Sequence, residues 1–159
     1  MNAPKPPKIN INFSLPARSG GFAYAPPKPS SPDQDMRQLV ALFNARRLPE
    51  AASLAQQVVG KHPQLVLAWR ILGMAVLAMG RDAVVPWQQV TRLTPKDAEA
   101  WNNLGSALEA AGDKAGAMAA FEHALLLSPE LVEAHNNLGQ VLLAQGKTGD
   151  ALKHLQEAV

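Results

Sequence analysis

Beyond the first 32 residues, apolar side chains recur at the spacing of a helix rather than that of a strand. Trp101, Leu104, Gly105 and Leu108 lie at positions i, i+3, i+4 and i+7, which is one face of an α-helix. Gly112 follows, and glycine is the residue best suited to a left-handed helix cap. The pattern therefore predicts an amphipathic helix that ends at Gly112.

A second amphipathic stretch comes directly after it. Residues 114–127 keep small or bulky apolar residues on one side, and Ser128-Pro129 then stops the helix. The apolar side consists of Ala117, Phe121, Ala124 and Leu125. Together the two stretches predict an antiparallel helical hairpin.

This hairpin pattern repeats along the chain. A proline precedes an aromatic residue by six positions in three copies: Pro63 and Trp69, Pro95 and Trp101, Pro129 and His135. Each aromatic is followed at +3 and +4 by leucine and glycine, and a turn glycine comes later: Gly73 and Gly80, Gly105 and Gly112, Gly139 and Gly146. Three copies in phase predict a stacked array of hairpins.

The spacing of tryptophan, leucine-glycine, glycine, alanine, phenylalanine, alanine and proline resembles the tetratricopeptide repeat of 34 residues. The resemblance implies an all-α, right-handed superhelical solenoid of antiparallel helix hairpins that binds a protein or peptide partner. On this pattern residues 1–31 form a disordered, proline-rich basic tail. The repeats then cover residues 32–65, 66–97, 98–131 and 132–159, the last of them truncated.

Two repeats depart from the pattern. Residues 66–97 are two residues short, and Pro86 lies in the first turn of the second helix, so we expect a local change of superhelical angle. Residues 32–65 lack the tryptophan, and Leu39 replaces the glycine, as expected of a terminal, capping repeat. Residue 159 lies inside a helix, which favours a fragment of a longer protein over an edge covered by a partner.

Gly105 and Gly139 lie in mid-helix, where glycine costs about 1 kcal/mol relative to alanine. Their recurrence predicts a close helix crossing at which a side chain would clash. Phe121 and Leu155 are the residues expected to fill the space beside them.

Two asparagines on the same helix position suggest a binding surface. Asn103 and its counterpart Asn137 lie about 200° from the aromatic residue and should face the inner wall of the array. An amide both donates and accepts, so a pair can hold the backbone of an extended peptide. The alternative is that these asparagines solvate the wall or bond one another. Asn102 and Asn136 are better placed for bonds at the groove edge or between helices.

The candidate partner-binding residues follow from this stripe. Carboxylates beside the asparagines would bind basic side chains, and polar residues one turn later would line the same wall: Glu99, Glu133, Ser106 and Gln140. In the first and second repeats the asparagine position carries Arg37 and Ile71. Stacked inner-wall asparagines resemble those in the tetratricopeptide arm of O-linked N-acetylglucosamine transferases. A second hypothesis is thus the substrate-recruiting N-terminal region of a larger glycosyltransferase-like enzyme.

The inner wall of the front half has a different composition. Apolar residues would present a patch that anchors a partner, although burial in the core explains them equally well: Met36, Val40, Phe43, Ile71 and Met74. In the tail, residues 9–15 alternate apolar and polar positions. One hypothesis places this tail segment in the front groove until a partner displaces it.

Charge is distributed unevenly along the chain. Residues 1–32 hold four basic and no acidic side chains, residues 33–96 hold eight and four, and residues 97–159 hold three and nine. The three segments therefore carry +4, +4 and −6. A basic front and an acidic back could steer a partner or make copies associate head to tail, as a self-assembling scaffold. Ordinary solvated surfaces are the alternative.

The sequence offers little support for chemistry. It has no cysteine, no pair of histidines at metal-ligand spacing, no glycine-rich phosphate loop and no recognisable nucleophile motif. We therefore expect no catalysis by this segment, no cofactor and no metal. Four spread basic residues are weak evidence for nucleic acid. With no apolar run of about 20 residues and no signal peptide, a cytoplasmic location without a membrane span is expected.

Overall fold

The computed structural model describes residues 31–158, which form eight α-helices and, within that range, no strand. The helices follow one another in this order: α1 Pro32–Asn44, α2 Leu48–Lys61, α3 Val66–Ala78, α4 Val84–Leu93, α5 Ala98–Ala110, α6 Lys114–Leu127, α7 Val132–Ala144 and α8 Thr148–Glu157. The fold is the all-α solenoid that the sequence predicts. The expectations for the tail, including the alternating residues 9–15, lie outside the described residues.

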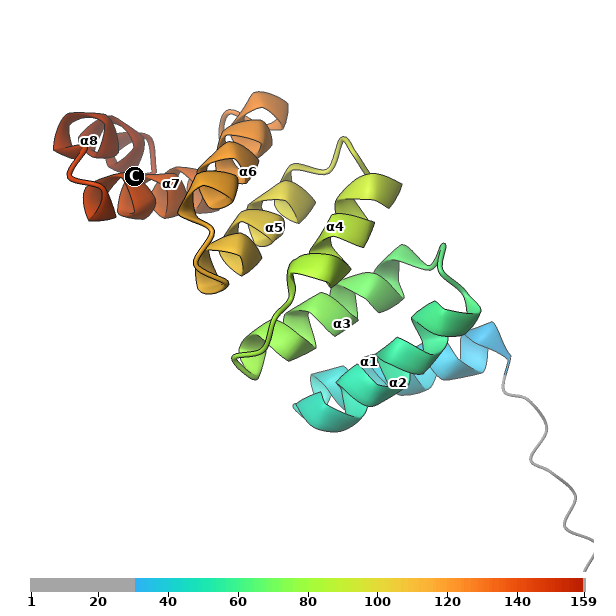
Figure 1. Cartoon of the computed structure of the whole chain (residues 1–159). Helices are drawn as coiled ribbons and strands as arrows, with labels where there is room; N and C mark the ends of the chain where they lie inside the picture. The colour runs from blue at the N-terminus through green and yellow to red at the C-terminus, as the bar shows by residue number, and fades with distance from the viewer. Residues whose placement is uncertain (1–30, 159) are drawn as a thin grey trace, which may run out of the picture.

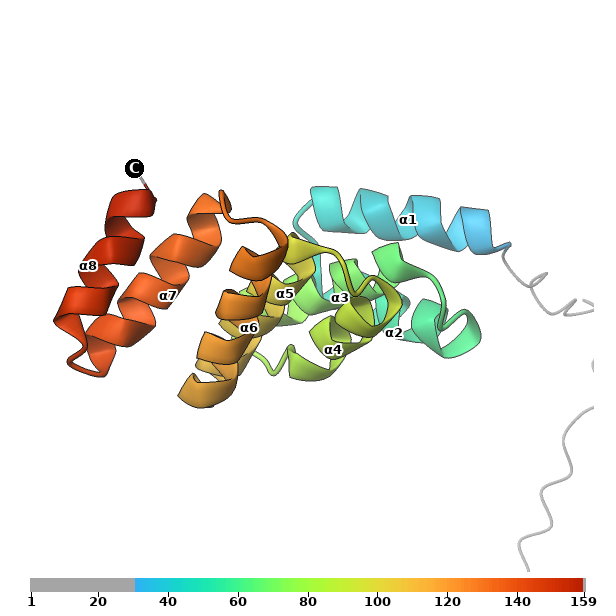
Figure 2. The ribbon, with the colours of Figure 1, turned by 90° about the horizontal axis from the view of Figure 1, so that it is seen from above.

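Each helix packs against the next one in sequence, so the molecule is a row of four antiparallel hairpins (Figure 1). The loops that lead into α3, α5 and α7 lie along the same edge of the row as the start of α1. Seen from above, α1 lies toward one end of the row and the α7–α8 hairpin at the other (Figure 2). This topology places the first turns of α5 and α7 next to each other.

The hairpin turns depend on a left-handed backbone residue. Gly80, Gly112 and Gly146 have φ angles of 67°, 86° and 76°, as expected for residues that end a helix in this way. In the first hairpin the corresponding residue is Arg46, with φ of 58°. The first repeat therefore makes the same turn at the cost of a conformation that suits glycine better.

The mid-helix glycines mark the close helix crossings that the sequence predicts. A Cβ atom added at Gly105 would lie 2.5 Å from the Phe121 ring, and one at Gly139 would lie 2.8 Å from Leu155. In the second hairpin a Cβ atom at Gly73 would lie 2.7 Å from the indole nitrogen of Trp87. The second, third and fourth hairpins are thus each held by a large side chain seated on a glycine, a contact that we call the glycine lock.

The second hairpin also changes how neighbouring hairpins stack. Helix α4 has 10 residues whereas α2 and α6 have 14, and Pro86 lies in its first turn as predicted. Helix α1 packs against α3 and α5 packs against α7, but α3 and α5 do not approach each other to a similar extent. This weaker contact lies where the sequence predicts a change of superhelical angle, between the second and third hairpins.

Candidate functional site

The first turns of the inner helices are fixed by a recurring side-chain bond to the loop before them. In three hairpins the ring nitrogen of the aromatic residue bonds a proline carbonyl: Trp69 to Pro63 over 2.9 Å, Trp101 to Pro95 over 3.0 Å and His135 to Pro129 over 2.9 Å. This bond explains why the proline precedes the aromatic residue by six positions. It also explains why histidine, which has a ring N–H, can replace tryptophan in the last hairpin.

A pocket of about 180 Å³ lies between the first turns of α5 and α7. We call it the acidic pocket, and it is lined by Glu99, Asn102, Asn103, Leu131 and Glu133. Three of the predicted binding residues, Glu99, Asn103 and Glu133, are therefore neighbours in space. Leu131, the residue just before α7, provides the apolar part of the lining.

Asn102 joins the two helices that form the pocket. It is 9 % exposed, and its Oδ1 atom accepts a hydrogen bond of 2.9 Å from Nδ2 of Asn137. Within residues 31–158, its own Nδ2 group has no hydrogen-bond partner, and neither has the amide of Asn103. The pocket thus contains two solvent-accessible amide donors, on Asn102 and Asn103, that are free to bind an acceptor.

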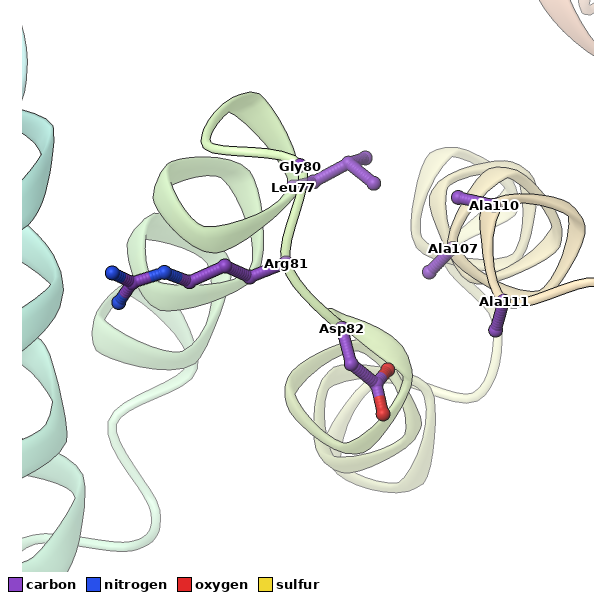
Figure 3. A pocket seen from close by; sticks show the side chains of 7 residues that line it. All are labelled: Leu77, Gly80, Arg81, Asp82, Ala107, Ala110 and Ala111. Atoms are coloured by element: carbon purple, nitrogen blue, oxygen red, sulfur yellow. The ribbon is translucent and has the colours of Figure 1, made fainter.

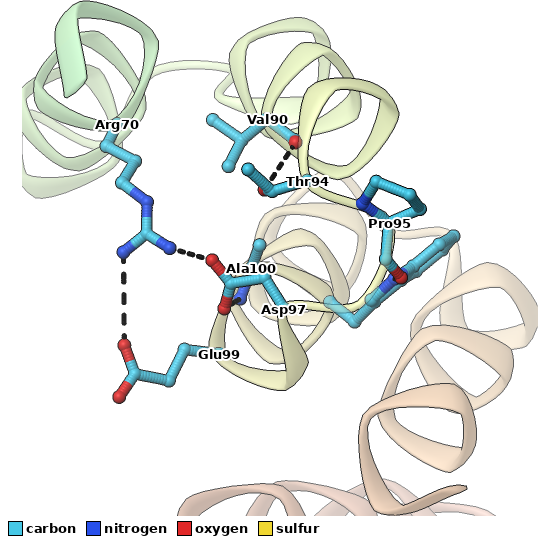
Figure 4. A network of polar contacts seen from close by, with 8 residues as sticks. Arg70, Val90, Thr94, Pro95, Asp97, Glu99 and Ala100 are labelled. Atoms are coloured by element: carbon cyan, nitrogen blue, oxygen red, sulfur yellow. Dashed lines mark hydrogen bonds and ion pairs between the residues drawn. The ribbon is translucent and has the colours of Figure 1, made fainter. Parts of the chain in front are cut away.

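An ion-pair network lies beside the pocket (Figure 4). The Asp97 side chain caps α5 by accepting from the Ala100 amide over 3.1 Å, and it also pairs with Arg70 of α3. A second guanidinium nitrogen of Arg70 lies 3.9 Å from Glu99. Because the Glu99 side chain remains 73 % exposed, most of its carboxylate is still available to another cation.

The other polar residues predicted to bind a partner lie outside the acidic pocket or are bonded within the protein. Ser106 is half-buried and donates to the Asn102 carbonyl over 3.2 Å, so its hydroxyl is engaged within its own helix. Asn137 uses its Nδ2 group on Asn102, and Gln140 is exposed outside the pocket lining. Arg37 is exposed on α1, two hairpins away from the acidic pocket.

The apolar patch predicted on the front wall belongs mainly to the core. Ile71 is 2 % exposed and is therefore part of the packed interior rather than a partner-binding residue. Met36, Phe43 and Met74 are half-buried and pack against the first core cluster, which contains Leu39 and Ile71. These side chains are buried because α1, α2 and α3 close over one another, an arrangement that helical spacing alone does not reveal.

A larger cavity of about 310 Å³ lies where the α3–α4 turn faces the end of α5 (Figure 3). Leu77 points into it from α3 toward Ala107, Ala110 and Ala111, while Arg81 points away. The sequence predicts no binding residue here. Its lining combines the apolar side chains of Leu77 and three alanines with the polar turn residues Arg81 and Asp82.

The last hairpin contains a pair of facing histidines. The Nδ1 atoms of His135 and His154 lie 3.0 Å apart, which joins α7 to α8 by one shared proton. Residues 31–158 contain no group of three or more His, Asp or Glu side chains that could hold a metal ion. None of the helices in the same range is long and apolar enough to cross a bilayer.

Two important residues were not identified as site residues from the sequence. Arg70 and Asn102 each come one position after the recurring aromatic residue of their repeat. Each of them bonds a side chain of the next hairpin. The signal was present, because position +1 after Trp69, Trp101 and His135 is polar every time. For Asn102 and Asn136 the sequence did suggest bonds between helices, and for Asn102 the structure confirms it.

Comparison with protein families agrees with the repeat pattern. Models described as tetratricopeptide repeat match residues 37–84, 98–131 and 120–153. No curated protein matches the chain significantly in sequence.

Solved structures share the fold. MamA 41-end from Desulfovibrio magneticus RS-1 superposes with a TM-score of 0.77 at 22 % identity, covering 80 % of this chain and 73 % of that one. A crystal structure of MamA gives a TM-score of 0.77 at 20 % identity, covering 82 % and 78 %. At this identity the likeness establishes the solenoid alone.

Proposed function

Because the chain belongs to the tetratricopeptide repeat family, whose hairpin arrays serve as protein-interaction and scaffold modules, we propose that it binds an extended basic segment of a partner protein at the acidic pocket. The observation that supports this most directly is the pairing of unsatisfied amide donors with two carboxylates in one small pocket. The amides would bind the backbone, and the carboxylates would bind a basic side chain.

The side-chain amides of Asn102 and Asn103 suit a peptide backbone because their N–H donors have no acceptor within residues 31–158. The Nδ2 atom of Asn102 is open to solvent although most of the residue is buried. A peptide carbonyl that accepts from these donors takes the place of water, and such a hydrogen bond contributes about 0.5–1.5 kcal/mol. Donors that are free in this way favour a ligand that presents backbone carbonyls.

The carboxylates define which side chain the pocket accepts. Glu133 is exposed and takes part in no ion pair among the described residues, and Glu99 shares only one distant contact with Arg70. A lysine or arginine between them would gain charge-assisted hydrogen bonds. At about 180 Å³ the pocket is smaller than the 300–1,000 Å³ usual for small-molecule sites, so it suits one side chain of a longer segment.

Peptide binding tests the proposal directly. Fluorescence polarisation would compare a labelled, extended peptide with alternating lysines against a peptide of the same length with glutamates in their place. We expect the lysine peptide to bind, and the double variant Glu99→Gln, Glu133→Gln to lose at least about ten-fold in affinity, or about 1.4 kcal/mol. Gln140→Ala is the matched control, because Gln140 is polar, exposed and outside the pocket.

The asparagines are tested separately. Asn102→Ala and Asn103→Ala together should lose most of the peptide binding while the helical circular dichroism stays unchanged. Equal binding by the double variant and the wild type would reject the amide part of the proposal. The proposal does not extend to the substrate-recruiting arm of a glycosyltransferase, because the side-chain amide of Asn137 donates to Asn102 and is not free to bind a peptide.

Self-assembly remains a second proposal on a separate observation, the unequal charge of the two halves. Residues 33–96 carry +4 and residues 97–159 carry −6, so copies could associate with opposite charges in contact. Light scattering between about 20 mM and 500 mM salt would show an oligomer that dissociates as screening increases. A mass equal to one chain at every concentration and salt would reject it.

A further inference from the structure

We propose that the chain's own N-terminal tail, through Lys5, Lys8 or Arg18, occupies the acidic pocket and competes with the partner. This inference rests on the proposed function, because it names an occupant for the same pocket.

Charge complementarity comes first. The 31 residues before α1 contain four basic and no acidic side chains, whereas the pocket presents two carboxylates on a half of the chain that carries −6. Lysine and arginine are the side chains that Glu99 and Glu133 can bind by charge-assisted hydrogen bonds. The same segment supplies backbone carbonyls for the free amides of Asn102 and Asn103. One short basic stretch therefore meets both requirements of the pocket.

The topology puts the pocket within reach. The start of α1 and the first turns of α5 and α7 lie along the same edge of the row of hairpins (Figure 1). The steps from α1 to α3 and from α5 to α7 are about 10 Å each, and the step from α3 to α5 is longer because these helices pack less closely, so the path exceeds roughly 30 Å. The thirteen residues from Arg18 to Ser31 span roughly 43 Å when extended at about 3.3 Å per residue. Arg18 can therefore reach Glu99 and Glu133, and the more N-terminal lysines can do so as well.

The front groove does not offer the tail an equivalent site. The apolar residues expected to receive residues 9–15 are packed into the core, with Ile71 2 % exposed. The acidic pocket, in contrast, presents the solvent-accessible amide donors of Asn102 and Asn103 beside two exposed carboxylates. Covalent attachment also gives a tail segment an effective concentration in the millimolar range, so even weak binding would fill the pocket.

Cross-linking of the full chain tests the contact. A carbodiimide joins a lysine amine to a carboxylate without a spacer, and mass spectrometry identifies the linked peptides. We expect links from Lys5 or Lys8 to Glu99 or Glu133 that disappear in high salt, and none from Lys28, which is only three residues before Ser31 and so spans about 10 Å. Links confined to carboxylates outside the pocket, such as Glu109 and Glu157, would overturn the inference. Mixing isotopically light and heavy chains adds a control: links found only between light and heavy copies would place a second copy's tail in the pocket and also overturn it.

Competition between the tail and the lysine peptide tests whether the tail blocks the acidic pocket. In the full chain, K5Q, K8Q, R18Q and K28Q together remove the tail's charge without touching any helix. We expect this variant to bind the lysine peptide on the order of five-fold more tightly than the wild type, the factor for a local concentration several times the tail's own Kd. Equal binding by both chains would overturn the inference and leave the proposed function intact. Failure of the charge-free variant to bind the peptide at all would instead reject the proposed function, and the cross-links would then decide the tail contact alone.

Discussion

The front and back halves of the array use the same hairpin for different purposes. In the front half α1 and α3 pack together, and the residues on their facing sides are apolar and largely buried, as Ile71 shows. In the back half α5 and α7 also pack together, but a hydrogen bond between Asn102 and Asn137 makes the connection and leaves a polar pocket beside it. The difference shows that the residues one and two positions after the aromatic decide whether the inner wall is sealed or open.

The glycine lock, in contrast, is common to both halves. Trp87 sits on Gly73 in the front, and Phe121 sits on Gly105 in the back. This contact lies inside each hairpin, away from the inner wall, so the wall can change its chemistry without loss of the hairpin. The following substitutions test this separation of packing from binding, from the largest expected effect to the smallest.

Removing the large side chain of a glycine lock should reduce the free energy of unfolding most. Phe121 is fully buried, and Phe121→Ala should reduce the free energy of unfolding by about 3–5 kcal/mol because it leaves a cavity over Gly105. Leu155 holds the equivalent position in the last hairpin but is only half-buried, so Leu155→Ala should cost about 2 kcal/mol or less. Urea unfolding of both variants checks the order. A larger loss for Leu155→Ala would contradict the proposed role of burial.

Adding a methyl group to the glycine should cost less. At Gly105 the new Cβ would meet the Phe121 ring at 2.5 Å, which should cost about 1–3 kcal/mol and outweigh the gain in helix propensity of about 1 kcal/mol. At Gly60 no atom lies within 4 Å, so Gly60→Ala is the matched control and should stabilise the chain by up to about 1 kcal/mol. The two melting temperatures should therefore move in opposite directions. Stabilisation by both substitutions would refute the lock at Gly105.

The asparagine bond should contribute about 1 kcal/mol. Asn102→Ala removes the acceptor for Asn137 and the link between α5 and α7, so we expect a loss of about 0.5–1.5 kcal/mol. Asn136→Ala is the control, because the described residues give Asn136 no side-chain hydrogen bond. Hydrogen exchange should show faster opening at the start of α7 in Asn102→Ala alone. Equal exchange in the two variants would mean that the bond does not hold the helices.

The ion pair across the second and third hairpins should contribute least. Arg70→Gln breaks the contacts with Asp97 and Glu99, and partly exposed ion pairs are worth about 0.2–1 kcal/mol. The same substitution frees Glu99, so the lysine peptide should bind about two-fold more tightly at low salt, by less than 1 kcal/mol. Arg92→Gln, at an exposed residue without an ion pair in the described part of the chain, is the control. Weaker peptide binding by Arg70→Gln would contradict the competition for Glu99.

Much of this fold could be predicted from the sequence, because its contacts are local. Helix spacing, the turn glycines and the recurring proline depend on residues within one 34-residue unit, and the positive φ of Gly80, Gly112 and Gly146 agrees with the prediction. The pairing of Gly105 with Phe121 and of Gly139 with Leu155 was predictable for the same reason. Of the candidate site, the sequence correctly indicated that Glu99, Asn103 and Glu133 share a surface.

The tertiary structure decided what lies between hairpins. The angle between successive units decides whether Ile71 is buried and how Arg70 reaches Asp97. It also decides which atom of the Asn102 side-chain amide is bonded to Asn137 and which remains free. That angle follows from side chains of three different helices packing at once, and a periodic pattern contains no information about it. The sequence by itself therefore determined the repeating unit and its turns, because these follow from short-range sterics, while only the packed array determined which polar groups are left without partners and hence where a ligand would bind.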